Sequence, residues 1–345
     1  MPVEALSEDG ATSNHSQYFF QKLFMKLTNV EKNLLKLLKV SSPSDEEQKI
    51  IEVLTKQLSP FFEIKKILVT PNRHALLCLK GQPKVILAAH VDTVKGNLPI
   101  KITKTKIFGR GSCDNKGSAA AMITAGLEAL KNHQNNFGLL FTIGEEVSFD
   151  GAVAAKKFLS KHNFKPKLIV IGEPTDLKTV TAQYGVFCIE LAWSGTAAHS
   201  SILSPDSAIH KMIKDLAIIT AAKIPQTVFH VAKISGGTAA NVIADEAKAM
   251  LTFRSALPDI KKRVETILKK MSGRPKYKIL KNIPATNHSK PPFQENWVRY
   301  FTEMAFLTNS IVLGPGSIKQ AHSKNEFISR SGLNEAVEIY KKILK

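Results

Sequence analysis

The apolar positions of the chain follow two different rhythms, and each rhythm predicts a different kind of sheet. From about residue 63 to residue 175, short apolar runs such as KVILAAH, FGLLFTI and KLIVIG alternate with helical patterns such as GSAAAMITAGLEALKNH. Strands that alternate with helices are typical of an α/β sheet with helices on both faces. The first rhythm therefore predicts a mostly parallel, twisted sheet that is covered by helices.

The second rhythm begins after Tyr184, where VFCIELAWSG alternates apolar and polar positions. Over roughly the next 100 residues the order is strand, helix, strand, strand, helix, strand, which is the ferredoxin-like order. We predict that residues 184–284 form an inserted α+β domain, and that residues 27–183 and 285–345 form the main domain. After NHSKPPFQ the chain should return to helices, and SIVLGPGSIKQAH should rejoin the first sheet.

The first residues of the chain differ from both rhythms. Residues 1–26 are polar and lack the apolar core of a signal peptide, so we predict a flexible extension. The main domain should begin with the helical pattern NVEKNLLKLLKV. In the following SSPSDEEQ, Ser44 and Glu47 resemble a capping box that opens a second helix.

The chain is strongly basic, with 48 lysine and arginine residues against 29 acidic residues and a formal net charge of +19. These bases are spread along the chain and aromatic residues make up only 7%, so we predict no nucleic-acid partner. We interpret the charge as a solvated surface, with attraction of an anionic substrate or acidic partner as the alternative. Three cysteines without a CxxC motif suit a reducing cytoplasm, and the absence of a long apolar run predicts no contact with a membrane.

Polar side chains that suit a metal ion follow the ends of the predicted strands. Their motifs are AAHVDTV, GRGSCDNKG, TIGEEV, VIGEPTD and GPGSIKQAH, which hold His90, Asp92, Asp114, Glu145, Glu146, Glu173 and His322. Taken singly, each is more often a cap or a surface group. Together they would place several uncompensated charges at the carboxyl ends of the strands, where α/β folds bind ligands. Two imidazoles with several carboxylates suit zinc or a similar divalent ion, and two ions if one carboxylate bridges.

With these motifs in the same order and spacing, the chain from about residue 30 resembles the M20 family of zinc aminoacylases and peptidases. The resemblance implies two zinc ions, for which cobalt can substitute, and an inserted domain that acts as a lid. His90 and Glu173 would bind one ion, and Glu146 and His322 would bind the other. Asp114 would bridge the two ions.

The resemblance also implies roles for residues beside the ligands. Glu145 would be the general base that takes a proton from the attacking water and later passes it to the leaving amine. Asp92 would hold the His90 ring in its tautomer. The bond between Asp114 and Asn115 would be a cis peptide bond.

Three lid residues complete what the resemblance implies. His199, in GTAAHSS, would stabilise the oxyanion of the tetrahedral intermediate, often from the partner subunit, which implies a homodimer. Asn241 and Arg254 would contact the substrate, and an arginine suits an α-carboxylate. Without the resemblance, His199 would be a surface loop residue and Arg254 a structural ion-pair partner, so these alternatives stay open.

Three segments resemble the acetylornithine deacetylases more than the succinyl-diaminopimelate desuccinylases, namely LGPGSIKQAHSKNEF, GSCDNKG and IGEPTDLK. The expected reaction is hydrolysis of N2-acetyl-L-ornithine to ornithine and acetate, a step of arginine biosynthesis. The alternatives are succinyl-diaminopimelate, acetylcitrulline, a dipeptide, or lysine or ornithine linked to an acidic carrier protein. A catalytically silent homologue that only binds would have lost a ligand or the base, and here every position is filled.

Overall fold

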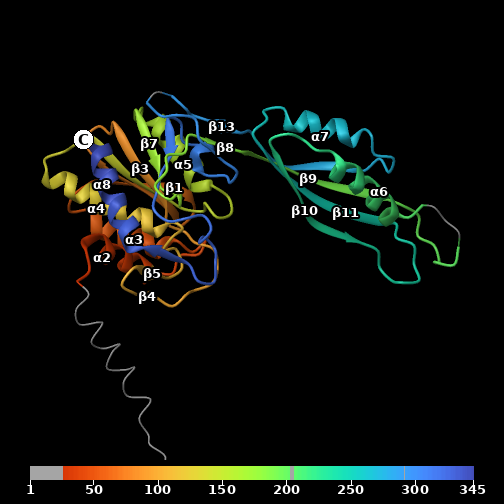
Figure 1. Ribbon diagram of the computed structural model, residues 1–345, viewed down its shortest axis with the longest axis horizontal. Helices are drawn as coiled ribbons and strands as arrows, with labels where there is room; N and C mark the ends of the chain where they lie inside the picture. The colour runs from red at the N-terminus through yellow and green to blue at the C-terminus, as the bar shows by residue number, and fades with distance from the viewer. Residues whose placement is uncertain (1–25, 203–205, 291) are drawn as a thin grey trace, which may run out of the picture.

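The computed structural model describes residues 26–202, 206–290 and 292–345, which form two parts along the long axis of the molecule (Figure 1). Apart from residue 26, the predicted N-terminal extension lies outside the described residues. The larger part contains the C-terminus. The chain leaves it once to form the smaller part and then returns to it, so the smaller part is an insertion. No helix in the described ranges is long and apolar enough to cross a membrane.

The larger part is built on a six-stranded sheet with the order β1-β2-β6-β3-β7-β15. The strands are β1 (Glu63–Thr70), β2 (Arg73–Lys80), β3 (Val85–His90), β6 (Phe137–Thr142), β7 (Leu168–Ile171) and β15 (Ser310–Val312). Strands β6, β3, β7 and β15 run parallel, whereas β1 and β2 form an antiparallel hairpin at one edge. The predicted parallel sheet is therefore confirmed, and SIVLGPG rejoins it as β15.

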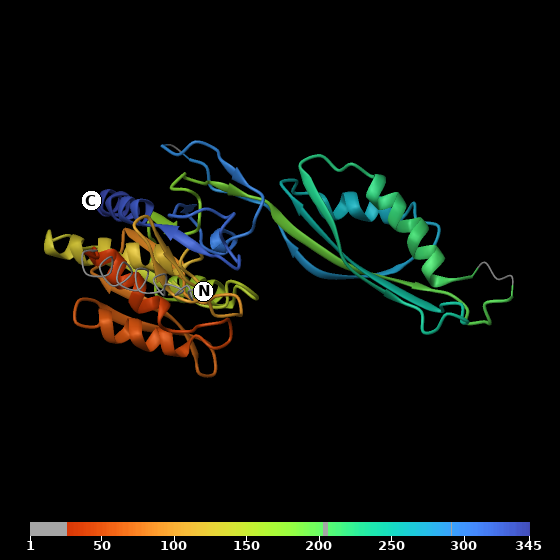
Figure 2. The ribbon, with the colours of Figure 1, turned by 60° about the horizontal axis from the view of Figure 1, so that its bottom comes forward.

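Helices cover both faces of this sheet (Figure 2). One face packs against α2 (Asn29–Leu38), α3 (Gln48–Leu58), α4 (Lys116–Lys131) and α8 (Arg330–Leu344), and the other against α5 (Asp150–Lys161) and the 3-10 helix η1 (Glu303–Ala305). In β3, Leu87 and Ala89 face the first group, Ile86 and Ala88 face the second, and all four are buried. Helix α4 packs closely because its residues are small; a Cβ on Gly126 would lie 3.3 Å from a leucine of β6.

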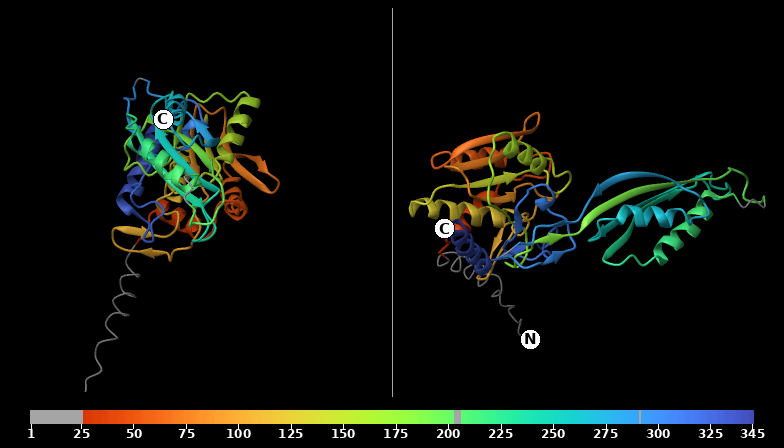
Figure 3. Two further views of the ribbon diagram at one scale, coloured as in Figure 1. Left: turned by 90° about the vertical axis from the view of Figure 1, so that its right-hand side faces the viewer. Right: turned by 90° about the horizontal axis from the view of Figure 1, so that it is seen from above.

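The inserted part is an antiparallel sheet with the order β10-β11-β9-β12. Its elements are β9 (Gly185–Ser194), α6 (Ala208–Ala221), β10 (Thr227–Gly236), β11 (Glu246–Ser255), α7 (Ile260–Leu268) and β12 (Lys276–Ile283). This is the predicted ferredoxin-like order, with both helices on one face (Figure 3). Its core includes Trp193, whose indole N–H donates to the buried Asp215 at 2.8 Å. The predicted boundaries, 184 and 284, fall one residue outside β9 and β12 and stay a prediction.

Two small sheets connect the parts and close the larger one. They are β13 (Thr286–Asn287), β8 (Ala182–Gln183) and β14 (Trp297–Val298), and β16 (Phe327–Ser329), β5 (Lys106–Phe108) and β4 (Lys101–Ile102). The pairing of β8 with β13 holds the two connections to the inserted part together. Between residues 292 and 309, β14 and η1 take the place of the predicted helices.

The start of α3 also differs from its prediction. The helix begins at Gln48, and neither Ser44 nor Glu47 forms the predicted capping box. The Ser44 hydroxyl instead donates to Asp92 Oδ2 at 2.7 Å, and Glu47 pairs with Arg73 at 2.7 Å. Hydrogen bonds to a buried carboxylate are charge-assisted and therefore stronger than a bond to a helix-end N–H group, so the Ser44 hydroxyl donates to Asp92.

Candidate metal centre

Three parallel strands end at one edge of the main sheet, and the predicted polar residues follow them. Strand β3 ends with a histidine, two glutamates come just after β6, and a further glutamate comes just after β7. The carboxyl ends of neighbouring parallel strands lie at the same edge, so these side chains meet, and two loops add an aspartate and a second histidine. The resulting cluster consists of His90, Asp114, Glu145, Glu146, Glu173 and His322.

The cluster contains two groups of possible metal ligands that share Asp114. In each group the ligand atoms lie within 4.8 Å of one another. His90 Nε2 lies 3.0 Å from Asp114 Oδ1 and 3.7 Å from Glu173 Oε1. His322 Nε2 lies 3.2 Å from Asp114 Oδ2 and 2.8 Å from Glu146 Oε2. The two oxygens of Asp114 thus face different histidines, which is the arrangement a bridging carboxylate needs.

Asp114 reaches the cluster from the turn before α4. The turn is tight, with Gly111 at φ +84° and a cis peptide bond between Asp114 and Asn115, as the family resemblance implied. The Asn115 amide donates to the carbonyl of Gly172, the residue before Glu173. This contact ties the turn that carries the shared aspartate to the turn that carries a ligand of one group.

Asp92 connects two other parts of the cluster. The Nδ1 atom of His90 lies 3.0 Å from the Asp92 carbonyl and 3.5 Å from its carboxylate, so both can orient the ring. The Asp92 carboxylate also accepts from Ser44 and, at 3.1 and 3.2 Å, from the N–H groups of Glu145 and Glu146. One buried aspartate therefore fixes the end of β3 against the turn after β6.

Four carboxylates and two imidazoles meet in the cluster, and the pKa values of these groups depend on one another. Burial, with a contribution from neighbouring carboxylates, raises the pKa of Glu145 and of Glu173 well above their ordinary values. Burial lowers the pKa of His90, but hydrogen bonds to Asp114 and other carboxylates outweigh it and raise that pKa overall. Hydrogen bonds to Asp114 and Glu146 raise the pKa of His322 to about 10. The carboxylates thus draw protons onto both imidazoles.

This donor set fits divalent cations. A cation among the carboxylates would supply the charge that protonated histidines otherwise bring, and it would free both imidazole lone pairs for binding. Imidazole nitrogens with carboxylate oxygens are ligands that zinc accepts. The residues that would hold such ions are those of the two ligand groups, with Asp114 in both.

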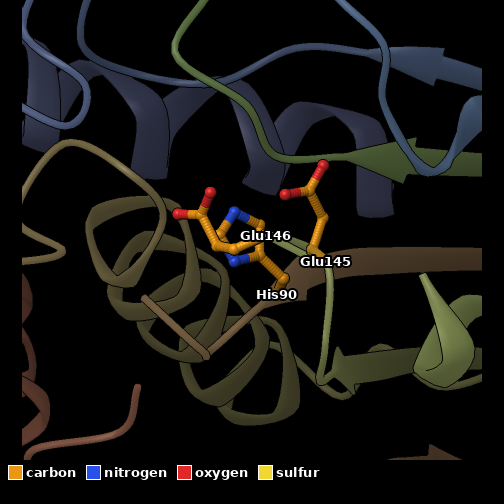
Figure 4. A group of neighbouring side chains, drawn as sticks. All are labelled: His90, Glu145 and Glu146. Carbon is orange, nitrogen blue, oxygen red and sulfur yellow. The ribbon is translucent and has the colours of Figure 1, made fainter. Parts of the chain in front are cut away.

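Glu145 and Glu146 leave the same turn but point their carboxylates apart, on either side of the His90 ring in the view of Figure 4. Glu146 belongs to the ligand group of His322, whereas Glu145 belongs to neither of the two groups that share Asp114. Glu145 still has an oxygen within 4.8 Å of ligand atoms of His90 and Glu146. Glu145 therefore lies beside the two ligand groups that share Asp114 and within reach of the same space.

The structure does not bring His199 and Asn241 to this cluster. They lie on the loops after β9 and between β10 and β11, at the end of the inserted part farthest from the main sheet (Figure 1). The ten-residue β9 alone separates the two ends by about 30 Å. His199 is exposed, with Nδ1 2.8 Å from the Ser201 hydroxyl, and the Asn241 carbonyl accepts from the Ser200 N–H.

Arg254 lies at the opposite end of the inserted part, next to the larger part. It lies opposite Val186 and Val228 in the sheet, at the end of β11 and near the segments that connect the inserted part to the larger part. Its Nη1 is buried and has no hydrogen-bond partner within the described part of the chain, and no ion pair of Arg254 occurs there. Burial lowers its pKa, whereas the negative charge of Glu145 opposes that shift. The structural ion-pair alternative for Arg254 therefore finds no partner among the described residues.

Two further buried carboxylates, which the sequence did not predict, lie near the cluster. Glu303, in η1, is fully buried, and burial raises its pKa to about 7. Neither oxygen of its carboxylate has a hydrogen-bond partner of regular geometry among the described residues, although the Thr142 hydroxyl is near. Glu326 is 1% exposed and contacts the turn of Asp114. For Glu326, the only feature of the sequence that pointed to the site was its place in SKNEF, four residues after His322. No feature of the sequence pointed to Glu303.

The chain is similar to several known proteins. The model of peptidase family M20/M25/M40 matches residues 86–266. A peptidase M20 domain-containing protein of Schizosaccharomyces pombe is 31% identical over 80% of this chain and 72% of its own length. A protein of Aspergillus flavus named "Probable carboxypeptidase" is 28% identical over 89% of this chain and 88% of its own.

Two solved structures share the fold. A tripeptidase of Staphylococcus aureus superposes with a TM-score of 0.79 at 21% identity, over 92% of this chain and 98% of that one. A dinuclear metal-binding peptidase of Bacillus subtilis gives a TM-score of 0.65 at 14% identity, over 91% and 96% of the two chains.

Proposed function

Because the chain belongs to peptidase family M20/M25/M40, whose members hydrolyse amide bonds, we propose that the cluster is a two-metal site that hydrolyses an N-acyl amino acid. The observation that carries the proposal is the position of Asp114, with one oxygen toward each histidine. A single-ion site would not need two histidines on opposite sides of one aspartate. The remaining carboxylate, Glu145, is then free for proton transfer.

Zinc is the ion that we propose, with cobalt as a substitute, because the donors are imidazole nitrogens and carboxylate oxygens. His90 and Glu173 would hold one ion, Glu146 and His322 the other, and Asp114 both. When bound, the ions would polarise the acyl carbonyl and lower the pKa of a water at the site.

The chain's own residues would then carry the proton. Glu145 takes a proton from the water as its oxygen attacks the acyl carbon. The same carboxyl group returns the proton to the amine nitrogen as the carbon–nitrogen bond breaks, which gives a carboxylic acid and an amine. The acid then passes its remaining proton to the amine, so the released products are a carboxylate and an ammonium group. Asp92 contributes indirectly, because it orients His90 and fixes the backbone of Glu145.

The substrate we propose has a free α-carboxylate beside the amide, and N2-acetyl-L-ornithine is the first candidate. Arg254 supports the carboxylate, since its buried Nη1 has no partner in the described residues and lies within the field of Glu145. A guanidinium pairs with a carboxylate through two parallel hydrogen bonds. The carboxypeptidase names of several relatives favour a peptide with a free C-terminus as the second candidate. Both candidates have a carboxylate next to the bond that is cleaved.

We also propose a homodimer in the cytoplasm. His199 and Asn241 lie about 30 Å along β9 from the segments that connect the inserted part to the larger part, so a second subunit is the simplest source of these groups at the site. Strand β10 lies at an edge of its sheet, with exposed residues that a partner can cover. The three cysteines are free, as expected in a reducing compartment.

The test is release of free amine by the zinc- or cobalt-loaded protein. The substrates are N2-acetyl-L-ornithine, N-succinyl-diaminopimelate and an unmodified dipeptide, with Glu145→Gln as the control. Turnover of the acetyl substrate that Glu145→Gln abolishes would support deacetylation. Turnover of the dipeptide alone would keep the amidohydrolase and correct the substrate. A metal-loaded protein that cleaves none of a wider acyl-amino-acid and peptide set would overturn the proposed function.

A further inference from the structure

Glu326 connects two loops that are more than 200 residues apart in the chain. Its Oε1 accepts the N–H groups of Cys113 at 2.9 Å and Asp114 at 3.1 Å. Its Oε2 accepts from Arg110 Nη1 at 2.7 Å. The side chain is 1% exposed, so these charge-assisted bonds form away from water, where they are strong. The carboxylate therefore fixes the backbone of the residue that the two ligand groups share.

The same residue follows His322 by four positions. His322 sits in a loop, at φ +60°, and its side chain is 51% exposed, unlike the other histidine of the cluster, which is fully buried. Its ring reaches Asp114 Oδ2 at 3.2 Å and Glu146 at 2.8 Å. The distance between His322 and Asp114 thus depends on how the loop is attached to the turn.

The turn that carries Asp114 is held by more of its own contacts than the loop that carries His322. Asp114 lies directly before α4, and the Lys116 N–H donates to the Gly111 carbonyl across the turn. The loop of His322 is held to the same turn by the Cys113 thiol, which donates to Ser317 at 3.4 Å, before the histidine. After the histidine, the attachment within the described residues consists of the Glu326 carboxylate, the Glu326 carbonyl, which accepts from the Gly109 N–H at 3.2 Å, and the short β16 pairing that follows. Loss of the Glu326 carboxylate would loosen His322 more than Asp114.

We propose that Glu326 is a positioning residue that sets His322 at the distance from Asp114 at which a second ion binds. The inference rests on the proposed two-metal function. It predicts a selective effect: the ion held by Glu146, Asp114 and His322 depends on Glu326, and the ion held by His90, Asp114 and Glu173 depends on it much less. A merely structural role would weaken both sites or neither.

The experiment measures zinc affinity by competition with a chromogenic chelator, in full-length protein, without reference to activity. Glu326→Gln keeps the shape but removes the charge, and its amide NH2 must face either Arg110 or the N–H groups of Cys113 and Asp114, which are all donors. We expect one of the two dissociation constants to rise about 10- to 100-fold, as for other residues that orient metal ligands, and the other to change less than about threefold. Glu31→Gln is the matched control, because Glu31 is also 1% exposed and pairs with an arginine, Arg330.

A double-mutant cycle with His322→Ala decides whether the effect runs through the histidine. If it does, Glu326→Gln leaves the affinity of the one ion that His322→Ala still binds within about threefold. The inference would be overturned if Glu326→Gln caused the same loss of affinity in the His322→Ala protein as in wild type, or equal losses at both sites. It would also be overturned if Glu31→Gln caused a loss of similar size, or if folded Glu326→Gln bound both ions as wild type does. Wild-type protein that binds no zinc would instead refute the proposed function, so the two failures are distinguishable.

Discussion

The ligand cluster and the far end of the inserted part are built in opposite ways. In the cluster, Asp92 accepts hydrogen bonds from three groups, and Asp114 is held through its own N–H by a buried carboxylate. In the lid loops, His199 and Asn241 are exposed, and the side-chain bond of His199 is to its near neighbour Ser201. The cluster is therefore preorganised within the chain, whereas the exposed loops of His199 and Asn241 are not held by contacts with the cluster.

The largest effect should come from Glu145, which lies on the preorganised side. Glu145→Gln removes the base and leaves both ligand groups in place, so kcat should fall about 1,000-fold while the bound zinc stays at the wild-type amount. Amine release and metal content are measured on the same samples. Glu63→Gln, at an exposed position paired with Lys65, is the control and should keep full activity. A variant that loses its zinc together with its activity would make Glu145 a ligand.

His199 tests the other side of the comparison. His199→Ala should lower kcat about 100-fold, because one oxyanion donor is lost. If His199 acts across the dimer, mixing His199→Ala with Glu145→Gln in equal amounts creates one complete site in every mixed dimer, and about a quarter of the wild-type activity should return. Light scattering on the same mixture reports the dimer. Mixed dimers without recovered activity would place His199 in its own subunit's site or outside catalysis.

Arg254 lies between the two halves, at the end of the lid that adjoins the larger part. Arg254→Lys keeps the charge but loses the bidentate geometry, so KM for N2-acetyl-L-ornithine should rise about 10- to 100-fold with a smaller change in kcat. The α-carboxamide analogue of the substrate lacks the charged group and should be cleaved equally by both proteins. Arg263→Lys, at an exposed arginine that pairs with Asp259, is the matched control. A loss that is the same for acid and amide would contradict the assignment.

The smallest expected effect is on stability, and it comes from the buried carboxyl group of Glu303. Its pKa of about 7 lies above the ordinary value of 4.5, so between these pH values the folded protein holds a proton that the unfolded chain releases. Stability therefore falls as pH rises through this window, by roughly 3 kcal/mol above pH 7. Glu303→Gln should remove that loss and raise the unfolding temperature of metal-free protein at pH 8 but not at pH 4.5. Glu335→Gln, at an exposed position, should show no such pH dependence, and identical pH profiles for wild type and Glu303→Gln would contradict the assignment.

The sequence predicted the sheet and the cluster because both depend on local patterns. Apolar runs such as FGLLFT mark buried strands, and parallel strands necessarily bring the residues after their ends to one edge. Contacts between distant segments gave no such signal. Ser44 looked like a helix cap because its hydrogen bond to Asp92 spans 48 residues, and Glu326 looked like an ordinary loop residue because its partners are more than 200 residues away.

The lid also matters for how the chain reaches its folded state. Strand β15 pairs with β7 across about 140 residues, and closing a loop of that length costs conformational entropy. The inserted sheet, once formed, places Ile283 opposite Val186. It thereby brings together the two segments that connect the inserted part to the larger part. Most of the long loop is then already closed, and only the short segments on either side of the insertion remain to be ordered. The insertion thus acts as an internal clamp that lowers the entropic barrier to completing the main sheet.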